Sequence, residues 1–123
     1  RPANDLKVAV LGLTFKENVP DLRNSRVPDI IHELREYGVQ VLVHDPIARA
    51  EEAVEEYGIH LSEWGDLKDI DGIIVAVAHR RYAEMGLQKL LGPLRSQREG
   101  VVIDVKCLLD QAKLPKTLKY WRL

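Results

Sequence analysis

Two basic side chains follow the first apolar stretch of the chain, in a position suited to binding an anion. Val8–Leu11 is a short run rich in β-branched residues, which predicts a buried strand, and a polar loop begins at Gly12. Lys16 and Arg23 lie in this loop. Ligands of open α/β sheets bind where strands end and loops open toward helices. The residues alone therefore indicate an anion site, with ordinary surface charges or ion pairs with nearby acidic residues as the simpler interpretation.

A third basic residue, Lys106, follows another apolar run, Gly100–Val105. It either faces a ligand at the end of the predicted strand or extends its stem along the strand end and keeps its ammonium in water. The next residue, Cys107, is the single cysteine, and no histidine or other base stands beside it in the sequence. We therefore interpret Cys107 as structural and not as a nucleophile.

The histidines and acidic residues have no spacing typical of a metal site, so no bound metal is expected. His32 lies between apolar positions of a predicted helix and is not expected to be a ligand. His44 and His79 each stand at the end of a predicted strand, where either one is a candidate for lining a cleft. A self-contained NAD site of the usual kind is not expected, because the first loop has Gly12 but lacks the rest of the G-x-G-x-x-G pattern.

These positions are joined by alternating predicted strands and helices. Strands are expected over Val8–Leu11, Val39–His44, Gly72–Ala78 and Gly100–Val105, with a short edge strand within Leu118–Leu123. Helices are expected over Arg26–Tyr37, over Ile47–Tyr57, and from Tyr82 to Leu91 with an interruption at Gly86. The alternation predicts an α/β fold, a Rossmann-like doubly wound parallel sheet in a three-layer αβα arrangement. Right-handed crossovers then place four strand ends on one edge, at Gly12, Asp45, Ala78 and Lys106.

The helix ends carry their own signals. Asn24 or Ser25 is expected to cap the first helix, and Gly38 to end it in the left-handed conformation. Asp45 is expected to cap the second helix with Pro46 at its first position, and Gly58 to end that helix. Ser62 is expected to cap a short helical turn.

The overall composition limits the possible functions. With 123 residues the chain is one domain, and a net charge of −1 with a pI near 6.5 argues against nucleic acid as a partner. No apolar run approaches the roughly 18 residues that a membrane span needs, and no signal peptide is recognisable. A single cysteine excludes an internal disulfide and favours the cytoplasm.

The first loop also carries a family resemblance. GLTFKENVPDLRNSR resembles the opening of the C-terminal domain of the UDP-glucose/GDP-mannose dehydrogenase family, the NAD-dependent nucleotide-sugar dehydrogenases. The matching residues are Gly12, Phe15, Lys16, Asp21, Arg23 and Ser25. The resemblance continues through HDP at 44–46 and IDVK at 103–106 to the closing YWRL.

The resemblance implies roles for individual residues. Phe15 and Lys16 would contact the nucleotide-sugar, and Lys106 would help to hold it, although many family members carry arginine there. The DVK form is similar to members that act on N-acetylhexosamine nucleotides. Arg23 would reach across a domain interface to NAD. The catalytic cysteine of the family lies upstream of this domain, so no catalytic residue is expected here.

The resemblance also implies a longer protein. Residues 1–6 would be the end of an interdomain linker and residues 7–123 the UDP-sugar-binding domain, preceded by an NAD-binding domain and a connecting helix. The whole enzyme would form a homo-oligomer. It would oxidise the C6 alcohol of UDP-glucose or a UDP-N-acetylhexosamine to a carboxylate, through a thiohemiacetal and a thioester on its cysteine. The fragment alone would be inactive.

Two other classes remain for comparison. A phosphoacceptor receiver domain shares this architecture, but it needs an aspartate at the end of the middle strand, where this chain has Ala78 and His79. A stand-alone, non-catalytic nucleotide- or CoA-binding module is the stronger alternative. An upstream G-x-G-x-x-G and a cysteine in the parent reading frame would decide for the dehydrogenase.

Overall fold

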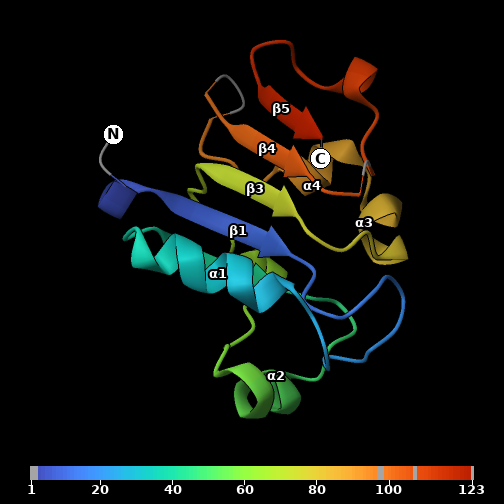
Figure 1. Cartoon of the computed structure of the whole chain (residues 1–123). Coiled ribbons are helices and arrows are strands. Elements are labelled where there is room, and N and C mark those ends of the chain that lie inside the picture. Colours follow the sequence, from blue (N-terminus) through green and yellow to red (C-terminus); the bar gives the residue numbers. More distant parts are fainter. Residues whose placement is uncertain (1–2, 97–98, 107, 123) are drawn as a thin grey trace.

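The computed structural model describes residues 3–96, 99–106 and 108–122. In this part of the chain, five parallel strands form one sheet in the order β2-β1-β3-β4-β5, of which Figure 1 labels β1, β3, β4 and β5. The strands are β1 (Lys7–Leu11), β2 (Gln40–His44), β3 (Gly72–Val75), β4 (Val101–Asp104) and β5 (Lys119–Arg122). The predicted α/β, Rossmann-like fold is confirmed, and the tail forms the expected edge strand.

Helices lie on both faces of the sheet. They are α1 (Val27–Glu36), α2 (Ala50–Tyr57), α3 (Arg80–Met85) and α4 (Leu87–Leu91). α1 lies on one face, and α3 and α4 lie on the other (Figure 1). The alternation of side chains along β1 explains this arrangement: Ala9 and Leu11 pack with the cluster under α3 and α4, and Val10 packs with the cluster under α1. Because β1 is apolar on both faces, it needs helices on both sides.

Glycines end or interrupt the helices as the sequence predicted. Gly38 follows α1 with φ of +87°, and Gly58 follows α2 with φ of +67°. Gly86, with φ of +82°, separates α3 from α4. Glycine adopts this left-handed region without the steric cost that a Cβ would add.

The predicted caps were mostly wrong. The residue before α1 is Arg26, although Ser25 Oγ still accepts a hydrogen bond from the Val27 amide at 3.3 Å. The second helix begins at Ala50 and not at Ile47. Asp45 accepts the amides of Ile47 and Ala48, as a cap would, but these residues precede α2, and the residue before the helix is Arg49. The short turn Trp64–Asp66 follows Glu63, so Ser62 does not cap it either.

The strand ends that carry the predicted site lie level with one another. In the sheet register, Leu11 pairs with His44 and with Val75, and Val75 pairs with Asp104. The loops that follow β1, β2, β3 and β4 therefore emerge at the same edge, as the right-handed crossovers predicted.

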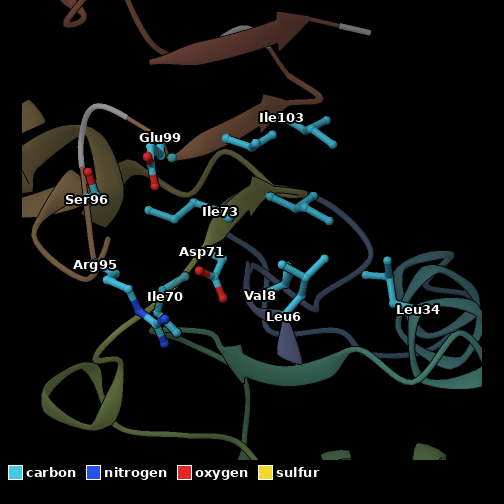
Figure 2. Close-up of a pocket in the computed structure, with 14 residues that line it drawn as sticks. Leu6, Val8, Leu34, Ile70, Asp71, Ile73, Arg95, Ser96, Glu99 and Ile103 are labelled. Atoms are coloured by element: carbon cyan, nitrogen blue, oxygen red, sulfur yellow. The ribbon is translucent and has the colours of Figure 1, made fainter. Parts of the chain in front are cut away.

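An apolar groove of about 380 Å³ lies beside α1, toward the amino ends of the strands (Figure 2). Val8 and Ile103 supply its sheet-side wall, and Asp71, Arg95 and Glu99 lie around it. It opens at the amino ends of β1, β3 and β4, and its lining includes none of the predicted site residues. The groove is therefore separate from the edge where the loops meet. None of the helices in the described ranges is long and apolar enough to cross a membrane.

Candidate functional site

A buried carboxylate, Asp45, joins the loops at the carboxyl edge of the sheet. Its Oδ2 accepts the amides of Leu13 at 2.7 Å and Thr14 at 3.2 Å, and its Oδ1 accepts those of Ile47 and Ala48, both at 2.9 Å. The loop after β1 is thus attached to the loop after β2 through one side chain.

The surroundings of Asp45 keep it ionised. Burial raises the pKa of Asp45, but the hydrogen bonds from His79, Leu13 and Ile47 outweigh burial and lower the pKa to about 2. At neutral pH Asp45 is therefore negatively charged, and both of its carboxylate oxygens accept hydrogen bonds from N–H groups of the protein. This carboxylate has a structural task and is not available to a ligand.

His79 connects the third loop to the same point. Its Nε2 lies 2.9 Å from Asp45 Oδ2 and 3.1 Å from Thr14 Oγ1, and its Nδ1 accepts the Asn18 amide at 3.0 Å. His79 and Thr14 are each 1% exposed. The sequence proposed His79 as a residue that lines the cleft; in the structure it lies beneath the loop.

Thr14, His79 and Asp45 have the residue types of a hydrolase triad but not its geometry. In a triad the acid and the nucleophile contact different ring nitrogens. Here Thr14 and Asp45 both contact Nε2, and the Thr14 hydroxyl donates to the backbone oxygen of Lys16 at 3.0 Å. Both side chains are also closed off from solvent, so this group cannot carry out nucleophilic catalysis.

The exposed part of the first loop presents Phe15 and Lys16. Phe15 is 54% exposed, although Phe is among the residue types most often buried, and Lys16 is exposed beside it. The Phe15 amide donates to the backbone oxygen of Asp21 at 2.8 Å, which folds the loop back on itself. An apolar ring beside an ammonium suits a ligand that has both an apolar face and a negative charge.

Arg23 forms an ion pair with Asp21. Its Nε and Nη2 lie 3.1 and 3.3 Å from the two carboxylate oxygens, and the Arg23 side chain is 78% exposed. The side-chain hydrogen bond from Arg23 lowers the pKa of Asp21, and the same bond raises the pKa of Arg23. Because the pair is exposed, it adds little to stability. It holds the guanidinium outward at the same edge as Lys16.

Lys106 lies on a turn that is organised by a second buried carboxylate, Asp104. Asp104 is 0% exposed, and it accepts the amides of Leu108 at 2.9 Å and Leu109 at 2.8 Å. Tyr120 on β5 donates its hydroxyl to the same carboxylate at 2.7 Å. Lys106 itself is exposed. The DVK motif thus combines a buried acid that shapes the turn with an exposed base at its tip.

The remaining candidates from the sequence have other environments. His44 Nδ1 lies 2.9 Å from the hydroxyl of Tyr82, and burial lowers the pKa of this half-buried imidazole. His32 is exposed on α1. Cys107 lies outside the described residues. Within the described ranges, no group of three or more His, Cys, Asp or Glu side chains is placed to hold a metal ion.

Sequence reasoning missed the polar side chains that hold the loops together. The available signal was weak, since an aspartate after an apolar strand is equally typical of a helix cap. The exposed groups at this edge are one aromatic ring and three cations, Phe15, Lys16, Arg23 and Lys106. The loops that present them are held by the buried side chains of Asp45, His79 and Asp104. This arrangement can bind an anionic ligand with a planar or apolar part. It does not contain a nucleophile paired with a base among the described residues.

Comparison with known proteins agrees with a ligand-binding domain. The matching family description is "UDP-glucose/GDP-mannose dehydrogenase family, UDP binding domain", and it covers residues 9–111. The chain is 48% identical to UDP-N-acetyl-D-glucosamine 6-dehydrogenase of Pseudomonas aeruginosa, over 87% of this chain and 25% of that protein. It is 40% identical to the Salmonella typhi protein of the same name, over 83% of this chain and 24% of the relative.

A solved structure supports the fold. NDP-N-acetyl-D-galactosaminuronic acid dehydrogenase from Methanosarcina mazei Go1 superimposes with a TM-score of 0.83 at 22% identity, over 99% of this chain and 25% of that one. The chain therefore spans about a quarter of the length of the relatives it matches.

Proposed function

The chain belongs to the UDP-glucose/GDP-mannose dehydrogenase family, and we propose that it is the UDP-sugar-binding C-terminal domain of an NAD-dependent nucleotide-sugar 6-dehydrogenase. The observation that carries this proposal is the family match over residues 9–111, which includes the loop of Phe15 and Lys16 and the turn of Lys106. Residues 7–123 would form the domain, and residues 1–6 the end of a linker from the domain before it.

Three exposed residues would hold the UDP-sugar. The ring of Phe15 offers an apolar surface to the base or sugar, and the ammonium groups of Lys16 and Lys106 offer charge to the diphosphate. Lysine binds phosphate as a compact point charge and does not impose the planar geometry of arginine. Support comes from the register of the sheet, which brings the loops after β1 and β4 to the same edge.

Arg23 would bind the NAD cofactor. Its planar fork can bind a phosphate or an amide with two parallel hydrogen bonds, and it stays charged at any physiological pH. Here the fork is occupied by Asp21, and because the Arg23 side chain is 78% exposed the ion pair is weak. Replacement of Asp21 by a cofactor group from a neighbouring domain would therefore cost little.

Among the described residues, the first βα turn is not free to bind a dinucleotide. In such a site, backbone amides of the first βα turn face the pyrophosphate. Here the amides of Leu13 and Thr14 are bonded to Asp45, and Gly12 is packed against Val77. NAD would accordingly be held mainly by the preceding domain, with Arg23 as the contribution of this one.

The substrate is proposed to be a UDP-N-acetylhexosamine, with UDP-glucose as the second choice. The two relatives at 48% and 40% identity are named for UDP-N-acetyl-D-glucosamine, and the DVK sequence at 104–106 is consistent with that group. The whole enzyme would convert the C6 alcohol to a carboxylate, and this domain would contribute to binding of the substrate.

Calorimetric titration of the 123-residue chain and of the full-length protein tests this proposal. UDP-N-acetylglucosamine should bind both, NAD should bind the full-length protein only, and Lys16→Ala should weaken binding of the UDP-sugar. Lys68→Ala is the matched control, because Lys68 is exposed and precedes β3 at the other edge of the sheet. A full-length protein that binds CoA and shows no NADH absorbance with UDP-sugars would instead be a non-catalytic binding module.

A further inference from the structure

The ring of His79 contacts the first loop at two points, one on each side of Phe15 and Lys16. Nε2 lies 3.1 Å from the hydroxyl oxygen of Thr14, and Nδ1 lies 3.0 Å from the backbone nitrogen of Asn18. Both ring nitrogens thus face the protein, and the side chain is 1% exposed. Phe15 and Lys16, the residues that would contact the substrate, therefore lie between two loop positions that both contact the buried ring of His79.

The contact with Asn18 fixes the position of the ring proton. A backbone N–H can only donate, so Nδ1 of His79 must accept with its lone pair. The proton of the neutral ring is then on Nε2, which donates to Asp45 Oδ2 at 2.9 Å and shares the same proton with Thr14 Oγ1 at 3.1 Å, since the Thr14 hydroxyl itself donates to the Lys16 oxygen. With one nitrogen accepting and the other donating, His79 has no free position for exchanging a proton with a ligand.

Hydrogen bonds order this loop, among them those from the Thr14 amide to Asp45 and from the Phe15 amide to the Asp21 oxygen. Residues 15–18 are all exposed, so apolar burial does not hold them. Asn18 also has φ of +63°, a left-handed conformation that asparagine adopts more easily than most residues with a Cβ. Two contacts stabilise it here: the bond from the Asn18 amide to His79, and the bond from the Arg80 amide to Asn18 Oδ1 at 2.8 Å. Both come from the start of the segment that follows β3.

We propose that His79, oriented by Asp45, is a positioning residue for nucleotide-sugar binding, which holds Thr14 and Asn18 so that Phe15 and Lys16 keep one geometry. The inference rests on the proposed function, because it takes Phe15 and Lys16 to bind the UDP-sugar. A loop that is already ordered loses less conformational freedom when a ligand binds, and this raises affinity without adding a contact to the ligand.

Steady-state kinetics of the full-length protein test this role. His79→Phe keeps a planar ring and removes both hydrogen bonds to the loop. Its KM for UDP-N-acetylglucosamine should rise about tenfold, with kcat and the KM for NAD within about twofold, provided that KM follows binding. His79→Asn places an amide oxygen near the position of Nδ1, so it should recover part of the affinity. His32→Phe is the matched control, because His32 is exposed on α1, and it should behave as the wild type.

A second variant covers the case in which His79→Phe does not fold. Thr14→Val keeps the shape of the side chain and leaves the pair of His79 and Asp45 in place, but it removes the hydroxyl that bonds the ring and the Lys16 oxygen. It should raise the same KM several-fold. An unchanged KM for the UDP-sugar in folded His79→Phe, or in Thr14→Val if His79→Phe is unfolded, overturns the proposal.

Amide hydrogen exchange provides a readout that needs no ligand. The Asn18 amide should be protected in the wild type and should exchange faster in His79→Phe, while amides of the β1 strand keep their protection. If the Asn18 amide loses its protection in His79→Phe but the KM for the UDP-sugar is unchanged, then His79 orders the loop without contributing to substrate binding. That result would contradict the proposal. A wild-type protein that protects Asn18 but binds no UDP-sugar refutes the proposed function and leaves the attachment of the loop to His79 supported.

Discussion

Gly12 lies so close to Val77 that a Cβ atom placed on Gly12 would be 2.6 Å from the Cβ of Val77 and 2.8 Å from its backbone nitrogen. The segment after β3 therefore passes directly over the end of β1. This contact allows His79, two residues after Val77, to reach under the loop that begins at Gly12. The glycine of the first loop is needed here for contact between two parts of the backbone, and not for contact with a phosphate.

Gly12→Ala should be strongly destabilising. The added methyl group has no space and the backbone φ is +98°, so we expect a loss of about 2–5 kcal/mol in the free energy of unfolding. Gly58→Ala is the matched control, because Gly58 also has a positive φ but has open space within 4 Å of where a Cβ would lie, and it should cost only about 1 kcal/mol. Denaturant unfolding measures both. Equal losses for the two variants would show that the close approach to Val77 has no energetic weight.

Asp45 should make stability depend on pH in the acid range. Its pKa is about 2 in the folded protein and 3.8 is its ordinary value, so it stabilises the fold above the ordinary value by about 2 kcal/mol. This contribution is lost as the pH falls from about 4 through about 2, because the unfolded chain then binds a proton that the folded one resists. The difference in unfolding free energy between wild type and Asp45→Asn should shrink over this range. Asp66→Asn, at an exposed position, should show no such trend.

Lys16→Ala and Arg23→Ala should separate kinetically in the full-length enzyme. Loss of one charge-assisted contact at Lys16 costs about 1.5–3 kcal/mol, so the KM for the UDP-sugar should rise roughly tenfold to a hundredfold with little change for NAD. Arg23→Ala should show the reverse, and Arg23→Lys should not rescue it, because an ammonium cannot reproduce the planar fork. Saturation curves for each ligand, with circular dichroism to confirm folding, provide the measurement. Small and equal effects on both ligands would show that the loop is only a charged surface.

Tyr120→Phe should affect the turn of Lys106, although Tyr120 lies 14 residues after it in the chain. The change removes the hydroxyl that donates to Asp104, which should cost about 1 kcal/mol of stability. The turn should also become less ordered, and UDP-sugar binding weaker by a few-fold. Trp121→Phe is the neighbouring control, because Trp121 is 52% exposed, and it should change neither quantity. An equal loss of affinity in both variants would assign the effect to β5 in general and not to the Asp104 contact.

The strands and the ends of the helices could be predicted because their signals are local. Apolar runs predicted the strands within Val8–Leu11, Gly72–Ala78 and Gly100–Val105, and Gly38, Gly58 and Gly86 mark helix ends through backbone conformations that glycine adopts most easily. The edge on which the loops meet followed from the handedness of the crossovers. Each of these inferences needs only neighbouring residues and a general rule of topology.

The buried hydrogen bonds of Asp45 and His79 beneath the loops could not be predicted, because they join residues that are far apart in the sequence. Asp45 bonds residues 31, 32 and 34 positions away, and an aspartate before a proline has a strong local alternative as a helix cap. That alternative led to a second helix predicted three residues too early. His79 had no local signal to separate lining a cleft from lying under a loop. The roles of Phe15, Lys16, Arg23 and Lys106 toward ligands remain predictions for the experiments above.

The division between buried Asp45, His79 and Asp104 and exposed Phe15, Lys16 and Lys106 has a consequence for how this fold can diversify. Substitutions at exposed positions away from special contacts usually change stability by less than about 0.5 kcal/mol. Natural variation or directed evolution can therefore sample new side chains at 15, 16 and 106 without first acquiring compensating mutations elsewhere. Substitutions at 45, 79 or 104 instead break buried hydrogen bonds, so each of them costs stability whatever it does to a ligand.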